Sequence, residues 1–207
     1  SPQNDIIIKT PPFIEEKDIE NFLDENKKWL NKSLQRNKNL KKRDRPLTFK
    51  QSDTCYYLGK KYTLQIEESK KWKIRLDNNF LYIKTPTPNE TDSIREKLID
   101  WYKKRAKEVI SDRTFIHAEK MSLSYNQIRI KNTKTRWGSC SSKKNLNFNW
   151  KLIMTPMEVL DYIVIHELSH LTHMDHSKKF WHLVEQHCEN YKDHVKWLKE
   201  HHLLLEI

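Results

Sequence analysis

The chain has 207 residues, 36% hydrophobic and 32% charged, and its formal net charge is +11. Seven Trp, eight Tyr and seven Phe can anchor a core, which excludes a disordered chain, and no apolar run is as long as a bilayer is thick, which excludes a membrane-spanning protein. Three cysteines are too few, and odd in number, for a disulfide framework, so we expect a cytoplasmic protein without a membrane partner.

The first predicted element is a helix over residues 14–36, where apolar residues recur at helical spacing among charged ones. Its second half begins a basic stretch, Lys27–Arg45, which holds nine Lys or Arg against one acid, Asp44. A stretch of this kind can contact a polyanion, so nucleic acid is one candidate partner. The alternative is that these side chains simply solvate a helix, and the sequence leaves both interpretations open.

Two β-hairpins are predicted next. Tyr56–Leu58 and Tyr62–Ile66 flank a turn at Gly59, and Trp72–Leu76 and Phe80–Ile83 flank a second turn. Each run is rich in β-branched and aromatic residues, which favour strands.

A long amphipathic helix is predicted from the turn after Pro86 to about Ser111. It completes an expected N-terminal module of residues 1–115, and residues 116–207 are expected to form the catalytic domain. Two strands are predicted in that second part, at Gln127–Lys131 and Leu146–Trp150.

The next helix has a clear start signal. Thr155 can act as N-cap, Pro156 fits the first helical position and Glu158 completes a capping box, so the helix should run from there to about His173. Two further helices are expected, at Lys178–Glu189 and Lys192–His202. Nine of the ten histidines fall within residues 166–202, which places the chemistry in these helices.

An H-E-x-x-H motif lies inside the helix that begins near Thr155, with His166, Glu167 and His170 at its fixed positions. A spacing of four residues puts both imidazoles on one helix face, where they can share a zinc ion, and lets Glu167 take a proton from a zinc-bound water. Two residues compete for the third ligand position. His173 lies on the same helix and is expected at the surface, whereas His176 can fold back and complete a three-histidine site with an open fourth position.

The residues around this motif resemble the YgjP-like metallopeptidase family over about Arg136–Trp181. The matching segments are Arg136–Cys140, Leu146–Trp150, Asp161–Leu171, His176–Ser177 and Phe180–Trp181. The resemblance implies a zincin-like fold, a zinc ion held by the three histidines and Glu167 as general base. The histidine spacing also resembles that of the WLM and SprT-like proteases, which act on proteins attached to DNA.

Three polar residues near the motif are candidate substrate-binding residues: Arg136, Asn147 and Asn149. Arg136 could stabilise an oxyanion or hold a substrate carboxylate, and a buried ion pair is an equal alternative. By resemblance, Leu146–Trp150 is expected to be an edge strand that pairs with the substrate backbone. The alternative is an ordinary core strand with Leu146 and Phe148 facing in, and Asn147 and Asn149 would then point to solvent or to the substrate.

Three further residues have structural interpretations. Gly138 is expected to permit a close backbone approach or a bulge. Cys140 could be a thiolate that occupies the open zinc position and keeps the enzyme latent, although a small buried thiol is the default. Phe180 is expected to pack the helix after His176 against the metal helix.

Together these features predict an α+β fold in which a helix and hairpin module precedes a zincin-like domain with a small mixed sheet and a metal-binding helix. The predicted activity is hydrolysis of peptide bonds in peptide or protein substrates by a zinc-bound water that Glu167 activates. Three rivals stay open: a DNA-associated protein with a structural zinc site, a protease acting on DNA-bound proteins, and a zinc hydrolase of non-peptide amides.

Overall fold

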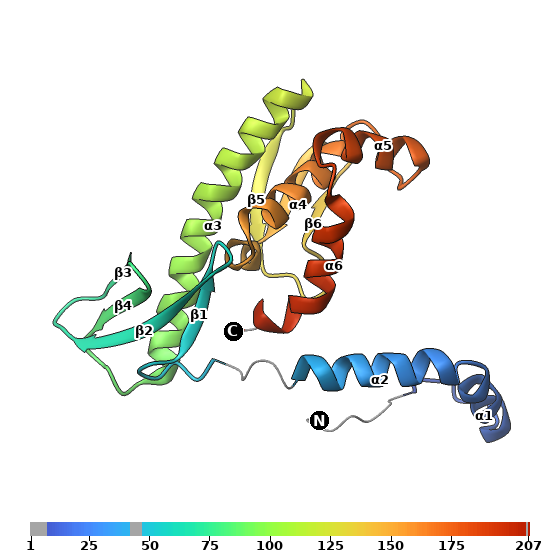
Figure 1. Cartoon of the computed structure of the whole chain (residues 1–207), viewed down its shortest axis with the longest axis horizontal. Coiled ribbons are helices and arrows are strands. Elements are labelled where there is room, and N and C mark those ends of the chain that lie inside the picture. The colour runs from blue at the N-terminus through green and yellow to red at the C-terminus, as the bar shows by residue number, and fades with distance from the viewer. Residues whose placement is uncertain (1–7, 42–46, 206) are drawn as a thin grey trace. The chain divides into compact units, whose positions relative to one another are not determined.

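The computed structural model describes residues 8–41, 47–205 and 207 of the chain (Figure 1). The chain divides into two compact units, Ser1–Arg45 and Pro46–Ile207. The architecture is mixed α+β, with two small sheets in the second unit. Within the described residues, no helix combines the length and the apolar character that a membrane span requires.

The first unit contains two helices, α1 (Glu16–Glu25) and α2 (Lys27–Lys41), where the sequence predicts one. The break lies at Asn26, whose backbone N–H and side-chain amide both donate to the carbonyl of Phe22, at 3.2 and 2.8 Å. A side chain that bonds the backbone in this way competes with helix continuation. The basic stretch forms α2 up to Lys41, residues 42–45 lie outside the described residues, and its contact with nucleic acid stays a prediction.

Both predicted hairpins are confirmed, and they join into one four-stranded sheet. β1 (Thr54–Tyr57) pairs antiparallel with β2 (Lys60–Glu68), and β3 (Lys73–Asp77) pairs antiparallel with β4 (Phe80–Thr85). β2 and β4 run parallel at the centre, which gives the order β1-β2-β4-β3.

Helix α3 (Thr91–Met121) continues well past its predicted end at Ser111. It stops at Ser122, which adopts a left-handed conformation with φ 53° and ψ 41°. Leu98, Tyr102 and Ile110 of α3 are fully buried. The predicted boundary between residues 115 and 116 falls inside this helix, so the division into 1–115 and 116–207 is not that of the two compact units and stays a functional prediction.

The second sheet has the order β5-β7-β6. β5 (Gln127–Lys131) and β7 (Asn145–Asn149) run parallel and confirm the two predicted strands. β6 (Gly138–Cys140) pairs antiparallel with the other side of β7, in a segment that the sequence predicts only as a connection. β7 is therefore the central strand, and β6 is an edge.

A short 3₁₀ helix, η1 (Trp150–Met154), leads into α4 (Met157–Ser169). The capping box predicted at Thr155 is wrong, because the Thr155 hydroxyl donates to the carbonyl of Leu152 at 2.8 Å and Pro156 is the N-cap. The predicted end near His173 is also wrong, since α4 stops at Ser169. The remaining elements are α5 (Lys178–His187), α6 (Tyr191–His201) and η2 (His202–Leu205).

The first hairpin is joined to the segment that begins α4. The backbone N–H groups of Leu58 and Gly59 donate to the carbonyls of Ile153 and Met154, at 2.8 and 3.2 Å. Gly59 has φ +76°, and a Cβ there would lie 2.8 Å from the Cα of Pro156. Only glycine satisfies both conditions without strain, so the turn holds the start of the metal helix in place.

Candidate metal centre

Helix α4 places two histidines of the motif one turn apart. Its flanks are apolar and buried, with Ile165 2% exposed and Leu168 fully buried, so the helix has a fixed position in the core. His170 lies at the C-cap, after which the chain turns and returns at His176. His170 is buried, His166 is half-buried and His176 is exposed.

The three imidazoles converge. One ring nitrogen from each of His166, His170 and His176 lies within 4.8 Å of the others. The Nε2 atoms of His166 and His176 are 3.2 Å apart, close to the roughly 3.3 Å that tetrahedral zinc–nitrogen bonds of about 2.0–2.1 Å imply. Among the described residues, these three side chains form the one group of His, Cys, Asp and Glu that could hold an ion, which leaves a fourth position open.

The protonation states of the rings suit metal binding. Burial, followed by the neighbouring His170 and His176, lowers the pKa of His166 to about 3, so this ring is neutral and offers a lone pair. His170 Nδ1 lies 3.0 Å from the carbonyl oxygen of His173. Because a carbonyl can only accept, Nδ1 carries the proton and Nε2 stays free for a metal. The sequence predicts His173 only as a surface residue and misses this role of its backbone.

Phe180 of α5 packs against the histidine cluster, as predicted. Its ring is fully buried, and its centroid lies 4.9, 4.5 and 4.8 Å from those of His166, His170 and His176. One aromatic side chain therefore contacts both the helix ligands and the loop ligand, and fixes their mutual position.

Glu167 lies beside the first ligand and is only 4% exposed. Its Oε2 is buried and has no hydrogen-bond partner among the described residues, as is true of His166 Nδ1. Burial raises the pKa of Glu167 to about 8, against the opposing effect of the Arg136 charge. A carboxyl group with a pKa near neutrality can both accept and return a proton.

The side chain of Glu167 lies directly against Gly138 of β6. A Cβ at Gly138 would lie 2.6 Å from Cγ and 2.7 Å from Cδ of Glu167 and would also collide with Oε1. The close approach predicted for Gly138 is confirmed, and the partner is the acidic residue of the motif.

The edge strand beside Glu167 is β6, so the prediction of β7 as an edge strand is wrong. Trp137 accepts a backbone bond from Asn149 at 2.8 Å, and Ser141 donates one to Asn145 at 3.0 Å. Alternate residues of an antiparallel strand face opposite sides, so Gly138 and Cys140 direct their N–H and C=O groups away from β7. Strand order depends on pairing between distant segments, which the pattern of one strand does not contain.

Of the three candidate substrate residues, Asn149 is placed wrongly by the sequence. It is 4% exposed, and its amide nitrogen donates to the carbonyl of Thr133 at 2.8 Å while its Oδ1 accepts from the backbone of Lys151 at 3.0 Å. It thus holds the loop before β6 and points to neither solvent nor substrate. Asn147 donates to the hydroxyl of Ser139 at 3.1 Å and braces β6.

Arg136 is exposed, and no carboxylate of the described residues lies within ion-pair distance of it. The alternative of a buried ion pair is therefore wrong. Cys140 lies outside the histidine cluster, and burial, followed by the charge of Glu167, raises its pKa to about 11. Its position outside that cluster disfavours the latent zinc–thiolate alternative.

The comparisons with known proteins cover different shares of the chain. The family model of the YgjP-like metallopeptidase domain matches residues 1–201. No curated protein matches. Among solved structures, the chain is similar to the metallopeptidase zymogen of Pyrococcus abyssi abylysin, at 22% identity and a TM-score of 0.37 over 42% of this chain and 90% of that one. It is also similar to the metallopeptidase zymogen of Methanocaldococcus jannaschii jannalysin, at 22% identity and a TM-score of 0.36 over 44% of this chain and 94% of that one.

The family assignment rests on the family model, which spans nearly the whole sequence. It implies a metal ion and a peptide or protein substrate. The chain belongs to the YgjP-like family of metallopeptidase domains.

Proposed function

We propose that the chain is a zinc-dependent peptidase in which His166, His170 and His176 hold the ion and Glu167 is the general base. The observation that carries this proposal is that three imidazoles converge beside the buried carboxyl group of Glu167, whose Oε2 has no hydrogen-bond partner among the described residues. Every side chain assigned here lies within residues 116–207, the part predicted to be catalytic.

Zinc is the metal that this donor set favours, because neutral imidazoles suit it and an open fourth position is typical of catalytic zinc. When bound, zinc supplies a Lewis acid that lowers the pKa of water toward neutrality and polarises a carbonyl oxygen.

Glu167 accepts the proton of the attacking water and returns it to the leaving amine. Its position next to His166 and its Oε2, which has no partner within the described part of the chain, support both steps, because that oxygen is free to take up the proton. Gly138 contributes by leaving room for the carboxyl group. Arg136 places a positive charge near enough to lower the pKa of Glu167, and we propose that it also attracts a carboxylate or oxyanion of the substrate.

The free edge of β6 supports a mode of substrate binding. Gly138 and Cys140 offer outward backbone groups next to Glu167, so an extended peptide can add to the sheet there. Backbone pairing of this kind holds the substrate without a strong sequence preference. It is also the arrangement expected of a zincin-like fold.

Variants of four residues test the proposal. His166→Ala and His170→Ala should lose bound zinc, measured by metal analysis after gel filtration, and should lose peptidase activity with it. Glu167→Gln should keep its zinc and lose about 10²–10⁴-fold in kcat. His187→Ala, at an exposed histidine on α5, is the matched control and should keep both. A glutamine variant that cleaves peptides at the parent rate would remove Glu167 from the mechanism.

A structural zinc site in a DNA-associated protein is the second candidate, and its discriminator is the fourth ligand. Structural sites close four protein ligands, often with cysteine, whereas the cluster here has three members among the described residues. Cobalt substitution distinguishes the two, because an exchangeable water in the visible spectrum indicates catalysis and four protein ligands indicate structure.

A further inference from the structure

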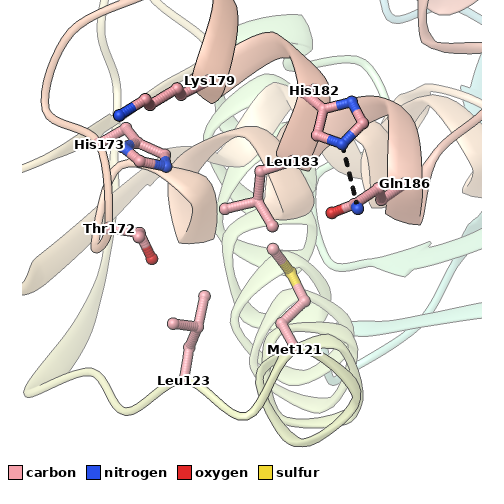
Figure 2. A pocket seen from close by; sticks show the side chains of 8 residues that line it. All are labelled: Met121, Leu123, Thr172, His173, Lys179, His182, Leu183 and Gln186. Atoms are coloured by element: carbon pink, nitrogen blue, oxygen red, sulfur yellow. Dashed lines mark hydrogen bonds between the residues drawn. The ribbon is translucent and has the colours of Figure 1, made fainter.

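A cavity lies next to the metal centre, between the end of α3, the turn after α4, and α5. Its volume is about 300 Å³, which suits one or two side chains. Figure 2 shows Lys179 beside His173 at one end of the cavity, His182 at the other, and Leu183 and Met121 between them.

The lining combines an apolar floor with one cationic side chain at the rim, Lys179. Met121, Leu123 and Leu183 are half-buried, whereas Lys179 and His182 are exposed. No Asp or Glu lines the cavity, and the ammonium group of Lys179 has no carboxylate within ion-pair distance among the described residues. The floor fits methylene groups, and the rim lacks a negative charge.

The cavity is not a second metal site. His173 and His182 belong to no group of described side chains that could share an ion. The amide nitrogen of Gln186 lies 3.3 Å from Nε2 of His182, which occupies that ring nitrogen.

One residue, His173, links the wall of the cavity to the metal centre. His173 lines the cavity with its side chain, and its carbonyl oxygen lies 3.0 Å from Nδ1 of His170. A side chain bound in this cavity would therefore lie against His173, the residue whose carbonyl orients the ring of His170.

We propose that this cavity is a specificity site that binds a glutamate side chain of the peptide substrate. The methylene groups of the glutamate pack on Leu183 and Met121, and its carboxylate pairs with the ammonium group of Lys179. The inference rests on the proposed peptidase function, because it concerns the substrate of the same centre. Lys179 is the specificity-determining residue, and it takes no part in the chemical step.

The test uses a fluorescent alanine-based peptide with a single Glu, Gln or Lys placed at each position in turn. Cleavage and binding by anisotropy are measured for the zinc-loaded parent, Lys179→Glu and Lys178→Glu. Lys178 is the matched control, because it is also exposed, lies in the same first turn of α5, carries the same charge and does not line the cavity.

We expect the parent to favour Glu over Lys at one position by about tenfold in KM and in peptide binding, with kcat little changed. Lys179→Glu should abolish or reverse this preference, whereas Lys178→Glu should keep it. Higher salt should reduce it. An equal preference in Lys179→Glu and the parent would overturn the inference, as would the absence of any preference in the parent.

The two proposals fail separately. If no peptide is cleaved by any variant, the proposed peptidase function fails, and the anisotropy data still decide whether the cavity selects glutamate. If the peptide without charge is cleaved equally by all three proteins and the charge preference does not follow Lys179, only the specificity site fails.

Discussion

The helix side and the loop side of the metal centre are built differently. Helix α4 supplies His166 and His170 from a buried segment, while the turn after it supplies His176 from an exposed one. Packing in the core positions the two helix histidines, whereas the position of the loop histidine depends on the side chains that contact it. On the loop side, the structure provides the ring of Phe180, whose centroid lies 4.8 Å from that of His176. The carbonyl of His173 comes from the same turn, but it holds the helix ligand His170.

The helix side also has supports that stiffen it. The β1–β2 turn holds the residues before α4 through Gly59, and Asp161 binds Arg113 and His117 of α3, at 2.6 and 3.2 Å. The packing of α4 in the core thus positions two of the histidines, whereas local contacts of the turn position the third. The following changes test that difference.

The largest effect is expected for Phe180→Ala. Removing this fully buried ring should lower the free energy of unfolding by about 3–5 kcal/mol and should weaken zinc binding, because all three imidazoles lose their common support. Urea unfolding and zinc titration check both. Phe115→Ala is the control, since Phe115 is 61% exposed and its loss should cost less than about 0.5 kcal/mol. Unchanged zinc affinity in Phe180→Ala would contradict the role of the ring.

Gly138→Ala should lower turnover by displacing Glu167 and should leave the zinc content unchanged. The new Cβ would lie 2.6 Å from Cγ of Glu167, so the carboxyl group must move. We expect kcat to fall by about 100-fold with zinc retained. Ser139→Ala, at the neighbouring position, removes only a bond to Asn147 and should keep nearly parental turnover. Parental turnover in Gly138→Ala would show that the carboxyl position is not critical.

Asp161 makes the stability of the helix side depend on pH. Burial alone would raise the pKa of Asp161, but hydrogen bonds and charges from His117 and Arg113 lower it below its usual value. A lowered carboxyl pKa stabilises the fold above the unfolded pKa, and this stability is lost as the pH falls through the folded pKa. Asp161→Asn should lower the free energy of unfolding by about 1–3 kcal/mol at pH 7. Its stability should also fall less steeply than that of the parent as the pH is lowered, which thermal unfolding at a series of pH values measures. Parallel pH curves for the variant and the parent would rule out this contribution.

Cys140→Ala should have the smallest effect. The thiol lies outside the histidine cluster, so its loss removes no proposed ligand, and zinc content and kcat/KM should stay within about a factor of two of the parent. A large rise in activity on this substitution would instead support latency through a zinc–thiolate bond.

The sequence predicts the residues of the histidine centre better than the helix ends and the strand order around it. The H-E-x-x-H spacing on a helix, the choice of His176 and the packing role of Phe180 agree with the geometry of the cluster, because they depend on local helix periodicity and on chain reversal. The hairpins and the strands β5 and β7 are also found, because their apolar patterns are regular.

The errors have local causes. Asn26 ends a helix by bonding the carbonyl of Phe22 with its side chain, which outweighs the continuing apolar period. Helix α4 ends at Ser169, where the backbone N–H groups of Leu171 and Thr172 donate to the carbonyls three residues back, at 2.9 and 3.1 Å, in a tighter turn that apolar spacing does not predict. The order of β5, β7 and β6 and the burial of Asn149 depend on pairings between distant segments.

The most direct test of the central claim is zinc K-edge absorption spectroscopy of the zinc-loaded protein. The three-histidine centre should show nitrogen and oxygen neighbours of zinc at about 2.0–2.1 Å, with scattering from three imidazoles and a light fourth ligand that exchanges with solvent. A sulfur ligand at about 2.3 Å, or four ligands that all come from the protein, would contradict it.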